Sequence, residues 1–225
     1  MVKAKVSGIR SMQDKNQVNL QRDHCVDYLR RAVQYTQSKP RCLILVCGFS
    51  GSGKTTVAKQ LSIETSAIHI RSDVERKRLF DLTLLESSQD RGLNIYTEEA
   101  NQTTFQRLKE LTGMIFGSGY GVVLDATLIV ASIRMEFESL ATSLNIPWCL
   151  IHCEASPGTI RSRLELRHCD ASEAGYAQYQ AQQARFDEFS REEQVHLVRV
   201  DTQSISSVEK GKTEALRFIA SAEKT

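Results

Sequence analysis

Hydrophobic residues along the 225-residue chain gather in five short runs separated by longer amphipathic stretches. Nearly continuous hydrophobicity is typical of strands that are buried on both faces, and amphipathic stretches between such strands predict the helices that cover them. This alternation predicts parallel βαβ units and a doubly wound α/β sheet. The predicted strands are CLILVC (42–47), AIHI (67–70), GVVLDA (121–126), PWCLIHC (147–153) and HLVRVD (196–201).

The polar segments divide the chain into two parts. Residues 1–40 lie outside the alternation and contain a charged helix that ends before Pro40, so we expect a helical leader or linker there and an α/β domain over 41–225. Residues 81–96 have turn formers and no clear period, which predicts a loop over the site. The helices expected in the α/β domain are about 54–63, 73–80, 97–116, 130–144, 156–168, 172–190 and 206–222.

The composition indicates which kinds of binding partner and which cellular compartment to expect. Lys+Arg number 29 and Asp+Glu 27, so the net charge of +2 gives no support to a nucleic-acid partner. The six cysteines form no CxxC pair, which suits reduced thiols in the cytosol. The longest apolar run is far shorter than the roughly 20 residues that span a bilayer, so we expect no membrane anchor and a cytoplasmic location. The histidines show no metal-ligand spacing, and zinc is not expected.

The segment GFSGSGKTT, Gly48–Thr56, fits the phosphate-binding pattern GxxxxGK[ST] between a predicted strand and a predicted helix. Its glycines let backbone N–H groups turn toward phosphate oxygens, and the helix presents its positive end to the same anion. Lys54 is expected to reach the β and γ phosphates, and the Thr55 hydroxyl to ligate Mg²⁺. The whole predicted nucleotide-binding set is Gly48, Ser50, Gly51, Ser52, Gly53, Lys54, Thr55 and Thr56.

The second predicted strand is followed by Asp73, at the edge where ligands bind in an open parallel sheet. A carboxylate there can take the proton of an attacking hydroxyl or help to place Mg²⁺, and Arg76, one helical turn on, can clamp an anionic group of the acceptor. The alternative is that Asp73 only caps a helix and that Arg76 lies on a solvated face. Both interpretations remain open.

The third predicted strand ends in VVLDAT, with Asp125 and Thr127 at its carboxyl end. An acidic residue after an apolar strand is the Walker-B arrangement, in which the carboxylate holds Mg²⁺ directly or through water. Thr127 is assigned to the acceptor side. The alternative is that either residue caps the helix that follows.

The segment TIRSRLELRHCDAS predicts a helix and a polar break, which together indicate a helical lid. Arg161, Arg163 and Arg167 lie on that helix. Phosphoryl transfer needs cations where the equatorial oxygens of the transferring group gain charge, and arginines on a closing lid meet that need. The alternative is that these arginines pair with Glu165 and other neighbours on an exposed helix.

In its order of motifs the chain resembles the P-loop small-molecule and polynucleotide kinases, including gluconate kinase, chloramphenicol phosphotransferase, the zeta toxins and the phage polynucleotide 5′-kinase. The matching residues are Gly48 to Thr55, Asp73 with Arg76, Asp125 with Thr127, and Arg163 with Arg167. The resemblance covers about residues 41–222 and implies a three-layer P-loop fold with a parallel five-stranded sheet of order 2-3-1-4-5. It also implies that Asp73 is the general base and that Arg163 and Arg167 contact the nucleotide phosphates.

A closer resemblance is to the ATP-binding half of bacterial proteins in which an aminoglycoside-phosphotransferase-like domain precedes a P-loop kinase-like domain. It is carried by GFSGSGKTT, IRSDVERKRLF and VVLDATLIVASIRMEFESLA, while KAKVSGIR and CVDYLRRA resemble the segment that joins the two halves. This resemblance implies that a separate aminoglycoside-phosphotransferase-like protein is a candidate partner.

These patterns lead to the expectation of an ATP- and Mg²⁺-dependent kinase that moves the γ-phosphate to a hydroxyl of a small molecule. Lys54, Asp73, Arg163 and Arg167 are the expected catalytic residues, and Thr55 and Asp125 the expected metal ligands. Two alternatives stay open. One is a nucleotide-binding regulatory module without its own acceptor. The other is a nucleic-acid 5′-hydroxyl kinase, which the lack of a basic excess and of an aromatic platform disfavours.

Overall fold

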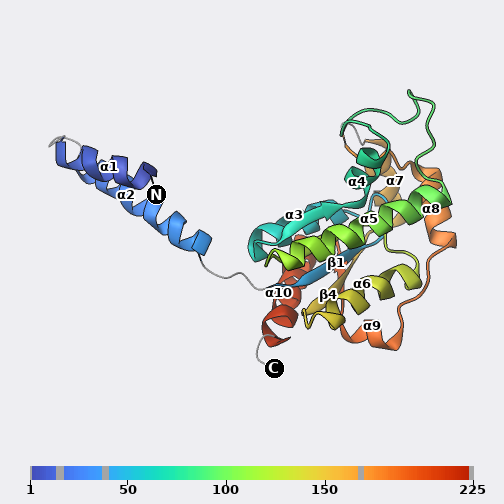
Figure 1. Ribbon diagram of the computed structural model, residues 1–225. Helices are drawn as coiled ribbons and strands as arrows, with labels where there is room; N and C mark the ends of the chain where they lie inside the picture. Colours follow the sequence, from blue (N-terminus) through green and yellow to red (C-terminus); the bar gives the residue numbers. More distant parts are fainter. Residues whose placement is uncertain (1, 14–17, 37–40, 167–169, 223–225) are drawn as a thin grey trace. The chain divides into compact units, whose positions relative to one another are not determined.

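The computed structural model describes residues 2–13, 18–36, 41–166 and 170–222 (Figure 1). The chain divides into two compact units, Met1–Ser38 and Lys39–Thr225. Unit 1 is a pair of helices, α1 (Val2–Gln13) and α2 (Val18–Thr36), that pack on each other. The sequence predicted α2 but not α1.

The helices of unit 1 meet through small side chains and leave larger ones exposed. Ala4 and Ser7 of α1 are buried, and a Cβ atom at Gly8 would lie 3.7 Å from the Cys25 sulfur, so the contact is close. The hydrophobic residues of this unit that are exposed in the structure are Val2, Val6, Ile9, Met12, Leu20, Val26, Leu29 and Val33. Unit 1 therefore buries few of its large hydrophobic side chains within itself.

Unit 2 is built on a five-stranded sheet in which every neighbouring pair is parallel. The order β2-β3-β1-β4-β5 confirms the predicted sheet order. The strand β1 lies in the centre and is completely buried, as its uninterrupted apolar sequence predicts. The strands are β1 (Leu43–Cys47), β2 (Ile68–Arg71), β3 (Val122–Asp125), β4 (Trp148–Glu154) and β5 (Leu197–Asp201).

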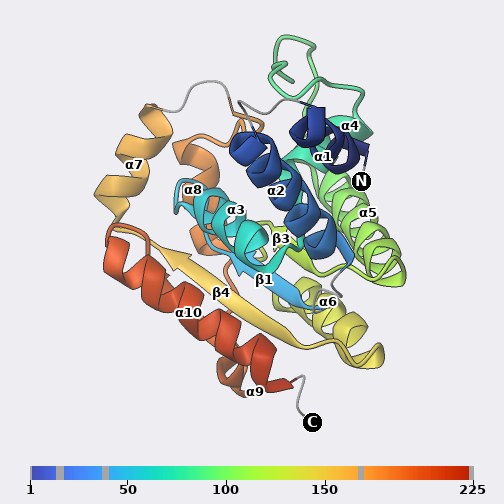
Figure 2. The same cartoon turned by 90° about the vertical axis from the view of Figure 1, so that its left-hand side faces the viewer.

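Helices cover both faces of the sheet and complete a three-layer α/β P-loop fold (Figure 2). On one face α3 (Lys54–Thr65) and α10 (Ile205–Ala222) bury Leu61 and Ile219 against the strands. On the other face α5 (Glu98–Gly117) and α6 (Ala131–Ser143) bury Leu108 and Phe137. Successive side chains of a strand point to opposite faces of the sheet. Alternate residues of the strands therefore pack into the two hydrophobic cores, one on each face.

The lid region differs from the prediction. The chain forms α7 (Pro157–Glu165), α8 (Tyr176–Ala184) and α9 (Arg191–Val195), so the single helix expected over 172–190 is wrong. Residues 185–190 leave the helix because Arg134 binds the carbonyl groups of Asp187 and Glu188. Ser190 then starts α9 with a capping box.

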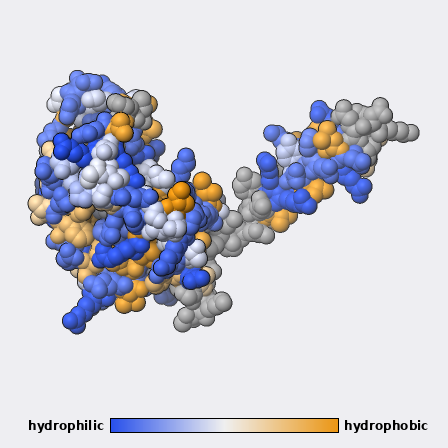
Figure 3. Space-filling view, turned by 180° about the vertical axis from the view of Figure 1, so that it is seen from behind, coloured by the Kyte–Doolittle hydropathy of each residue, from blue (hydrophilic) through white to orange (hydrophobic). Residues whose placement is uncertain are grey.

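The surface of unit 2 is mostly hydrophilic on the side seen in Figure 3, with smaller hydrophobic areas between. Within the described ranges, no helix is long and apolar enough to cross a membrane. The remaining helix, α4 (Ser72–Leu79), follows β2 directly, so Asp73 lies at the carboxyl edge of the sheet beside the ends of β1 and β3.

Candidate active site

The phosphate-binding loop lies between β1 and α3, as predicted. Gly48, Gly51 and Gly53 all have positive φ angles, of 135°, 82° and 89°. A Cβ atom at Gly48 would stand 2.4 Å from the carbonyl oxygen of Cys153, so only glycine fits there. Lys54 opens α3, and its Nζ donates to the carbonyl oxygen of Phe49 at 2.8 Å.

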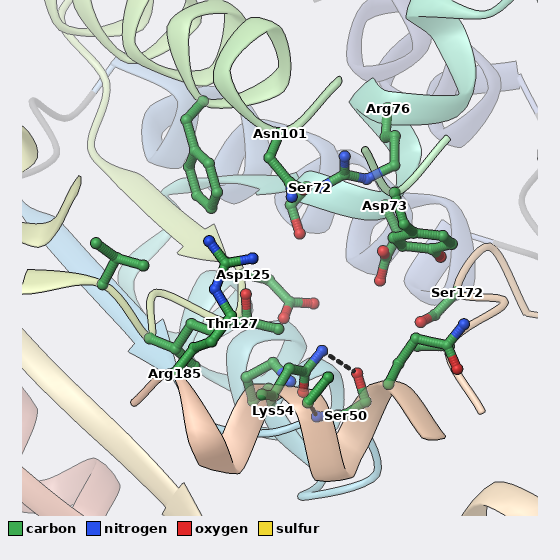
Figure 4. Close-up of a pocket in the computed structure, with 18 of the residues that line it drawn as sticks. Ser50, Lys54, Ser72, Asp73, Arg76, Asn101, Asp125, Thr127, Ser172 and Arg185 are labelled. Carbon is green, nitrogen blue, oxygen red and sulfur yellow. Dashed lines mark hydrogen bonds between the residues drawn. The ribbon is translucent and has the colours of Figure 1, made fainter. Parts of the chain in front are cut away.

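The loop is held from the lid by Gln182 of α8. The backbone N–H of Ser50 donates to Gln182 Oε1 at 2.9 Å, and Gln182 Nε2 donates to Ser50 Oγ at 3.0 Å, the bond drawn in Figure 4. This contact places α8 directly over the phosphate-binding loop. Gln182 could not be predicted as a site residue from the sequence, because a glutamine on a polar helix carries no signal by itself.

Arg163 supports the loop from behind. Its Nη1 donates to Thr202 Oγ1 at 2.8 Å and to the carbonyl oxygen of Gly51 at 3.3 Å, and Nη2 donates to the Thr202 carbonyl at 3.1 Å. Thr202 Oγ1 in turn donates to the carbonyl oxygen of Ser52 at 2.7 Å. Arg163 thus lies at the loop but does not border the cavity that contains Asp73. Arg167 lies outside the described residues, and its role stays a prediction.

The buried carboxylate of Asp125 lies at the end of β3, beside two side chains of β2 whose positions were not predicted from the sequence. His69 Nε2 is 3.4 Å and Arg71 Nε is 3.5 Å from Asp125 Oδ2. Burial acts to raise the pKa of Asp125, but the nearby side chains of His69 and Thr55 and the charge of Lys54 outweigh it and hold the pKa below its usual value. Asp125 is therefore ionised at neutral pH.

Arg71 also extends this cluster to the lid. Its Nη2 donates to Asp170 Oδ1 at 2.9 Å, so one guanidinium contacts both a strand-end carboxylate and the segment between α7 and α8.

Asp73 borders the same cavity as Lys54 and Asp125. Burial raises the pKa of its carboxyl, and nearby Asp125 raises it further, while Lys54, Arg76 and a hydrogen bond with Ser172 partly offset the rise. Figure 4 shows the side chains of Asp73 and Asn101 pointing into the same space. A carboxylate with a raised pKa beside the phosphate-binding lysine can accept a proton from a bound hydroxyl.

Arg76 is only 5% exposed, and its guanidinium contacts the loop after α4. Its Nη1 donates to the carbonyl oxygen of Ile95 at 3.0 Å, and its guanidinium lies 5.1 Å from the centre of the Tyr96 ring. Burial lowers the pKa of Arg76, and the nearby Asp73 partly offsets this effect. Arg76 borders the cavity, but its contacts are those of a residue that fixes the cavity wall.

Glu173 joins the loop over residues 80–97 to the lid. It pairs with the buried Lys77 at 2.9 Å and accepts hydrogen bonds from the backbone N–H and the hydroxyl of Ser88. The backbone N–H of Glu173 donates to the hydroxyl of Tyr96 at 3.2 Å. These contacts attach the loop to the segment before α8. The loop itself was predicted from the sequence, but the residues that hold it were not.

Two cavities meet at the phosphate-binding loop. The first, about 200 Å³, contains Ser50, Asp73, Arg76, Asp125 and Thr127. The second, about 460 Å³, is bordered by Thr56, Arg163, Thr202, Ile205 and Val208. Lys54, Thr55 and Asp170 border both cavities. Several of the predicted site residues within the described ranges therefore lie around one lysine, with Thr56 and Arg163 at one cavity and Asp73, Arg76 and Thr127 at the other.

The residues beside Lys54 suit a magnesium ion. Mg²⁺ prefers hard oxygen ligands and is usually held by one or two carboxylates, with waters and substrate phosphates completing its shell. Asp125 and the Thr55 hydroxyl lie within hydrogen-bonding reach of each other, and Asp125 Oδ2 is buried without a well-formed hydrogen bond. This donor set fits the ion that the phosphate-binding loop implies.

The sheet order, the glycine loop and the paired cavities define a P-loop protein. Residues 43–189 match the model of the AAA domain family AAA_33, which covers more than half of the chain, so the chain belongs to this family.

The curated relative Rv2004c, an uncharacterized protein of Mycobacterium tuberculosis (strain ATCC 25618 / H37Rv), is 28% identical over 193 residues. The match covers 83% of this chain and 38% of the relative, so the chain spans less than half the length of that protein.

Solved kinases share the fold. A sugar kinase from Janibacter sp. HTCC2649 superposes with a TM-score of 0.60 at 19% identity, covering 80% of this chain and 95% of the kinase. A gluconokinase from Sinorhizobium meliloti 1021 gives 0.59 at 18% identity, covering 84% and 97%. The APS kinase CysC of Mycobacterium tuberculosis, solved with AMPPNP and APS, gives 0.56 at 16% identity, covering 80% and 99%.

Proposed function

We propose that this chain is an ATP- and Mg²⁺-dependent phosphotransferase that moves the γ-phosphate of ATP to a hydroxyl group of a small molecule. The observation that carries the proposal is the position of Asp73, a partly buried carboxyl group with a raised pKa that borders the first cavity together with Lys54. A P-loop protein that only binds nucleotide has no need for such a proton acceptor.

The second cavity is the proposed site of the nucleoside. Ile205 and Val208 give this cavity apolar surface against which the nucleotide's base can lie. Thr56 borders the cavity where it meets the phosphate-binding loop. From there the phosphates would run along the loop to Lys54, with the N-terminus of α3 facing them. The kinases that share this fold support ATP as the donor, since one of them was solved with the ATP analogue AMPPNP.

In the proposed reaction the loop and Lys54 hold the β and γ phosphates in line with the acceptor hydroxyl. Asp73 takes the hydroxyl proton as the oxygen bonds to the γ-phosphorus. Thr55 and Asp125 would hold Mg²⁺, which when bound offsets the charge on the phosphate oxygens. Gln182 keeps the loop and the lid helix together through its two bonds to Ser50.

The test follows acceptor-dependent ADP release with Mg·ATP and a pool of cell metabolites. Asp73→Asn should lower this release by about 10²- to 10⁴-fold, the usual effect of losing a general base. Asp90→Asn, on the exposed part of the loop over residues 80–97, is the matched control and should retain the wild-type rate. If no metabolite raises ADP release and Asp73→Asn leaves basal hydrolysis unchanged, the kinase proposal is wrong.

A second measurement separates catalysis from folding. Because burial raises the pKa of Asp73, its ionised form is unfavourable in the folded protein. Its contribution to stability is present below the unfolded pKa and is lost as pH rises through the folded pKa. Asp73→Asn should therefore be inactive yet melt at a higher temperature than wild type at pH 7.5.

A second candidate function is a nucleotide-binding module that serves a separate aminoglycoside-phosphotransferase-like protein. It is favoured by the relatives, which extend well beyond the matched region, and by the exposed hydrophobic residues of unit 1. It predicts no acceptor of its own and no effect of Asp73→Asn, so the same assay distinguishes the two.

A further inference from the structure

One wall of the first cavity is hydrophobic. Phe105 of α5, Ile129 and Val130 of the segment after β3, and Ile133 of α6 all border it and are only partly buried. Phe105 and Ile133 also pack on the core, so one side of each is already covered. The uncovered sides face the cavity, where apolar surface in contact with water is unfavourable until a ligand covers it.

The charged groups of the cavity are already engaged. Arg185 pairs with Glu98 at 2.9 Å, and both side chains are exposed at the edge of the cavity. Arg76 binds the Ile95 carbonyl and stacks near Tyr96. The carboxyl groups of Asp73 and Asp125 lie close to Lys54, and the lowered pKa of Asp125 keeps that group ionised. Among the described residues that border the cavity, both arginines have other partners, so an acceptor with its own negative charge would meet these carboxyl groups without a free guanidinium from that set.

The cavity is compact. Its volume of about 200 Å³ must hold the acceptor beside the γ-phosphate. An apolar cavity of about 150 Å³ holds one benzene molecule. The available space therefore suits a body of about one six-membered ring with a short substituent.

We propose that the acceptor is a small neutral alcohol whose apolar body lies against Phe105, Ile129 and Ile133 while its hydroxyl faces Asp73. This inference rests on the proposed phosphotransferase function. The acceptor oxygen forms a bond to the γ-phosphorus, the bond from that phosphorus to the β–γ bridging oxygen breaks, and ADP leaves with the electron pair. Asp73 takes the proton of the acceptor hydroxyl.

The wall should set affinity more than rate, because the same apolar contact exists in the ground state and in the transition state. Replacing Ile133 by asparagine puts a polar group where the alcohol body rests. A mismatch of this size in an apolar pocket is worth about 10- to 200-fold. We therefore expect KM for the apolar alcohol to rise by that factor with little change in kcat. Met135 of α6, which is 59% exposed and does not border the cavity, provides the matched control Met135→Asn.

The experiment compares 2-phenylethanol and cyclohexylmethanol with glycerol, glucose and gluconate. Binding to the full chain is measured by calorimetry with Mg·AMPPNP, and transfer by ADP release with Mg·ATP. The expected result is binding and phosphorylation of the apolar alcohols, a raised KM in Ile133→Asn and an unchanged KM in Met135→Asn. Should Ile133→Asn fail to fold, the preference of the wild-type protein among the five alcohols decides the question.

The outcomes separate the two proposals. Apolar alcohols that bind but are never phosphorylated would support the acceptor class and contradict the proposed transfer reaction. Phosphorylation of glucose or gluconate in preference to the apolar alcohols would overturn the acceptor class and leave the transfer reaction standing. If none of the alcohols binds in the presence of Mg·AMPPNP, the acceptor class is wrong.

Discussion

Arg134 of α6 is a cation with no exposed surface, and its replacement should destabilise unit 2 more than any other single change discussed here. It pairs with Glu193 of α9 and donates to the carbonyl oxygen of Leu128 at 3.0 Å. It also binds the carbonyls of Asp187 and Glu188, and it lies 4.8 Å from the Phe189 ring. Arg134 thus fastens the segment after α8 to the segment after β3.

The magnitude follows from these contacts. Removing one member of a buried ion pair typically costs about 3–5 kcal/mol, because the remaining charge is buried without a partner. Leu128 has a φ angle of 48°, a conformation that a branched residue adopts only when its surroundings enforce it. For a domain of this size each kcal/mol lowers Tm by about 2–4 °C. Arg134→Met should therefore lower Tm by about 6–20 °C.

The assay is thermal melting of the full chain at pH 7.5, followed by circular dichroism. Arg134→Met combined with Glu193→Leu should recover part of the loss, because the double change leaves no unpaired charge. Arg191→Met, a change at a basic residue of the exposed start of α9, should move Tm by less than about 2 °C. A drop of under 2 °C in Arg134→Met, or a double variant worse than the sum of the single ones, would refute this account.

Three further predictions concern pH, the loop and the residues that support it. The pKa of Glu138 is raised to about 7 from 4.5, first by burial and then by neighbouring negative charge, so its contribution to stability is lost as pH rises through 7. Glu138→Gln should match wild type in Tm at pH 5 and exceed it at pH 8. Gly48→Ala should weaken ATP binding by at least about 10-fold in calorimetry, whereas Gly158→Ala, which meets no atom within 4 Å, should leave it unchanged. Arg163→Ala and Thr202→Val should each weaken ATP binding in the same calorimetric assay. Because the two side chains are hydrogen-bonded at 2.8 Å, a double-mutant cycle should show a coupling energy of about 0.5–3 kcal/mol. Strictly additive effects would contradict this prediction.

The fold was predictable because its signals are local and periodic. Buried parallel strands such as β1 must be apolar on both faces, and the helix-forming stretches between them leave few alternatives for connection. The sheet order followed from the family resemblance and is confirmed. The helix expected over 172–190 was wrong because Arg134, 53 positions before Asp187 in the chain, binds the carbonyl groups of Asp187 and Glu188. A propensity argument contains no information about such a distant partner.

The site was predictable at the residues that follow strands and not at those that reach it from elsewhere. Asp73 and Asp125 come directly after β2 and within β3, so their edge of the sheet could be inferred. His69 and Arg71 were missed although their spacing of two puts them on one face of β2, where the register pairs Arg71 with Asp125. Gln182 lies on a polar helix whose place over the loop only the folded chain reveals.

Asp170 connects the two halves of the candidate site. It borders both cavities with Lys54 and Thr55, and it bonds to Arg71, whose Nε lies 3.5 Å from Asp125. Because Asp170 belongs to the segment between α7 and α8, a shift of that segment would leave the charge of Arg71 directed mainly at Asp125. The carboxylate proposed to hold Mg²⁺ would then face a stronger competing cation. The position of this segment and the affinity of the proposed magnesium site should therefore be electrostatically linked, and we expect nucleotide binding to be tightest when Asp170 keeps Arg71 occupied.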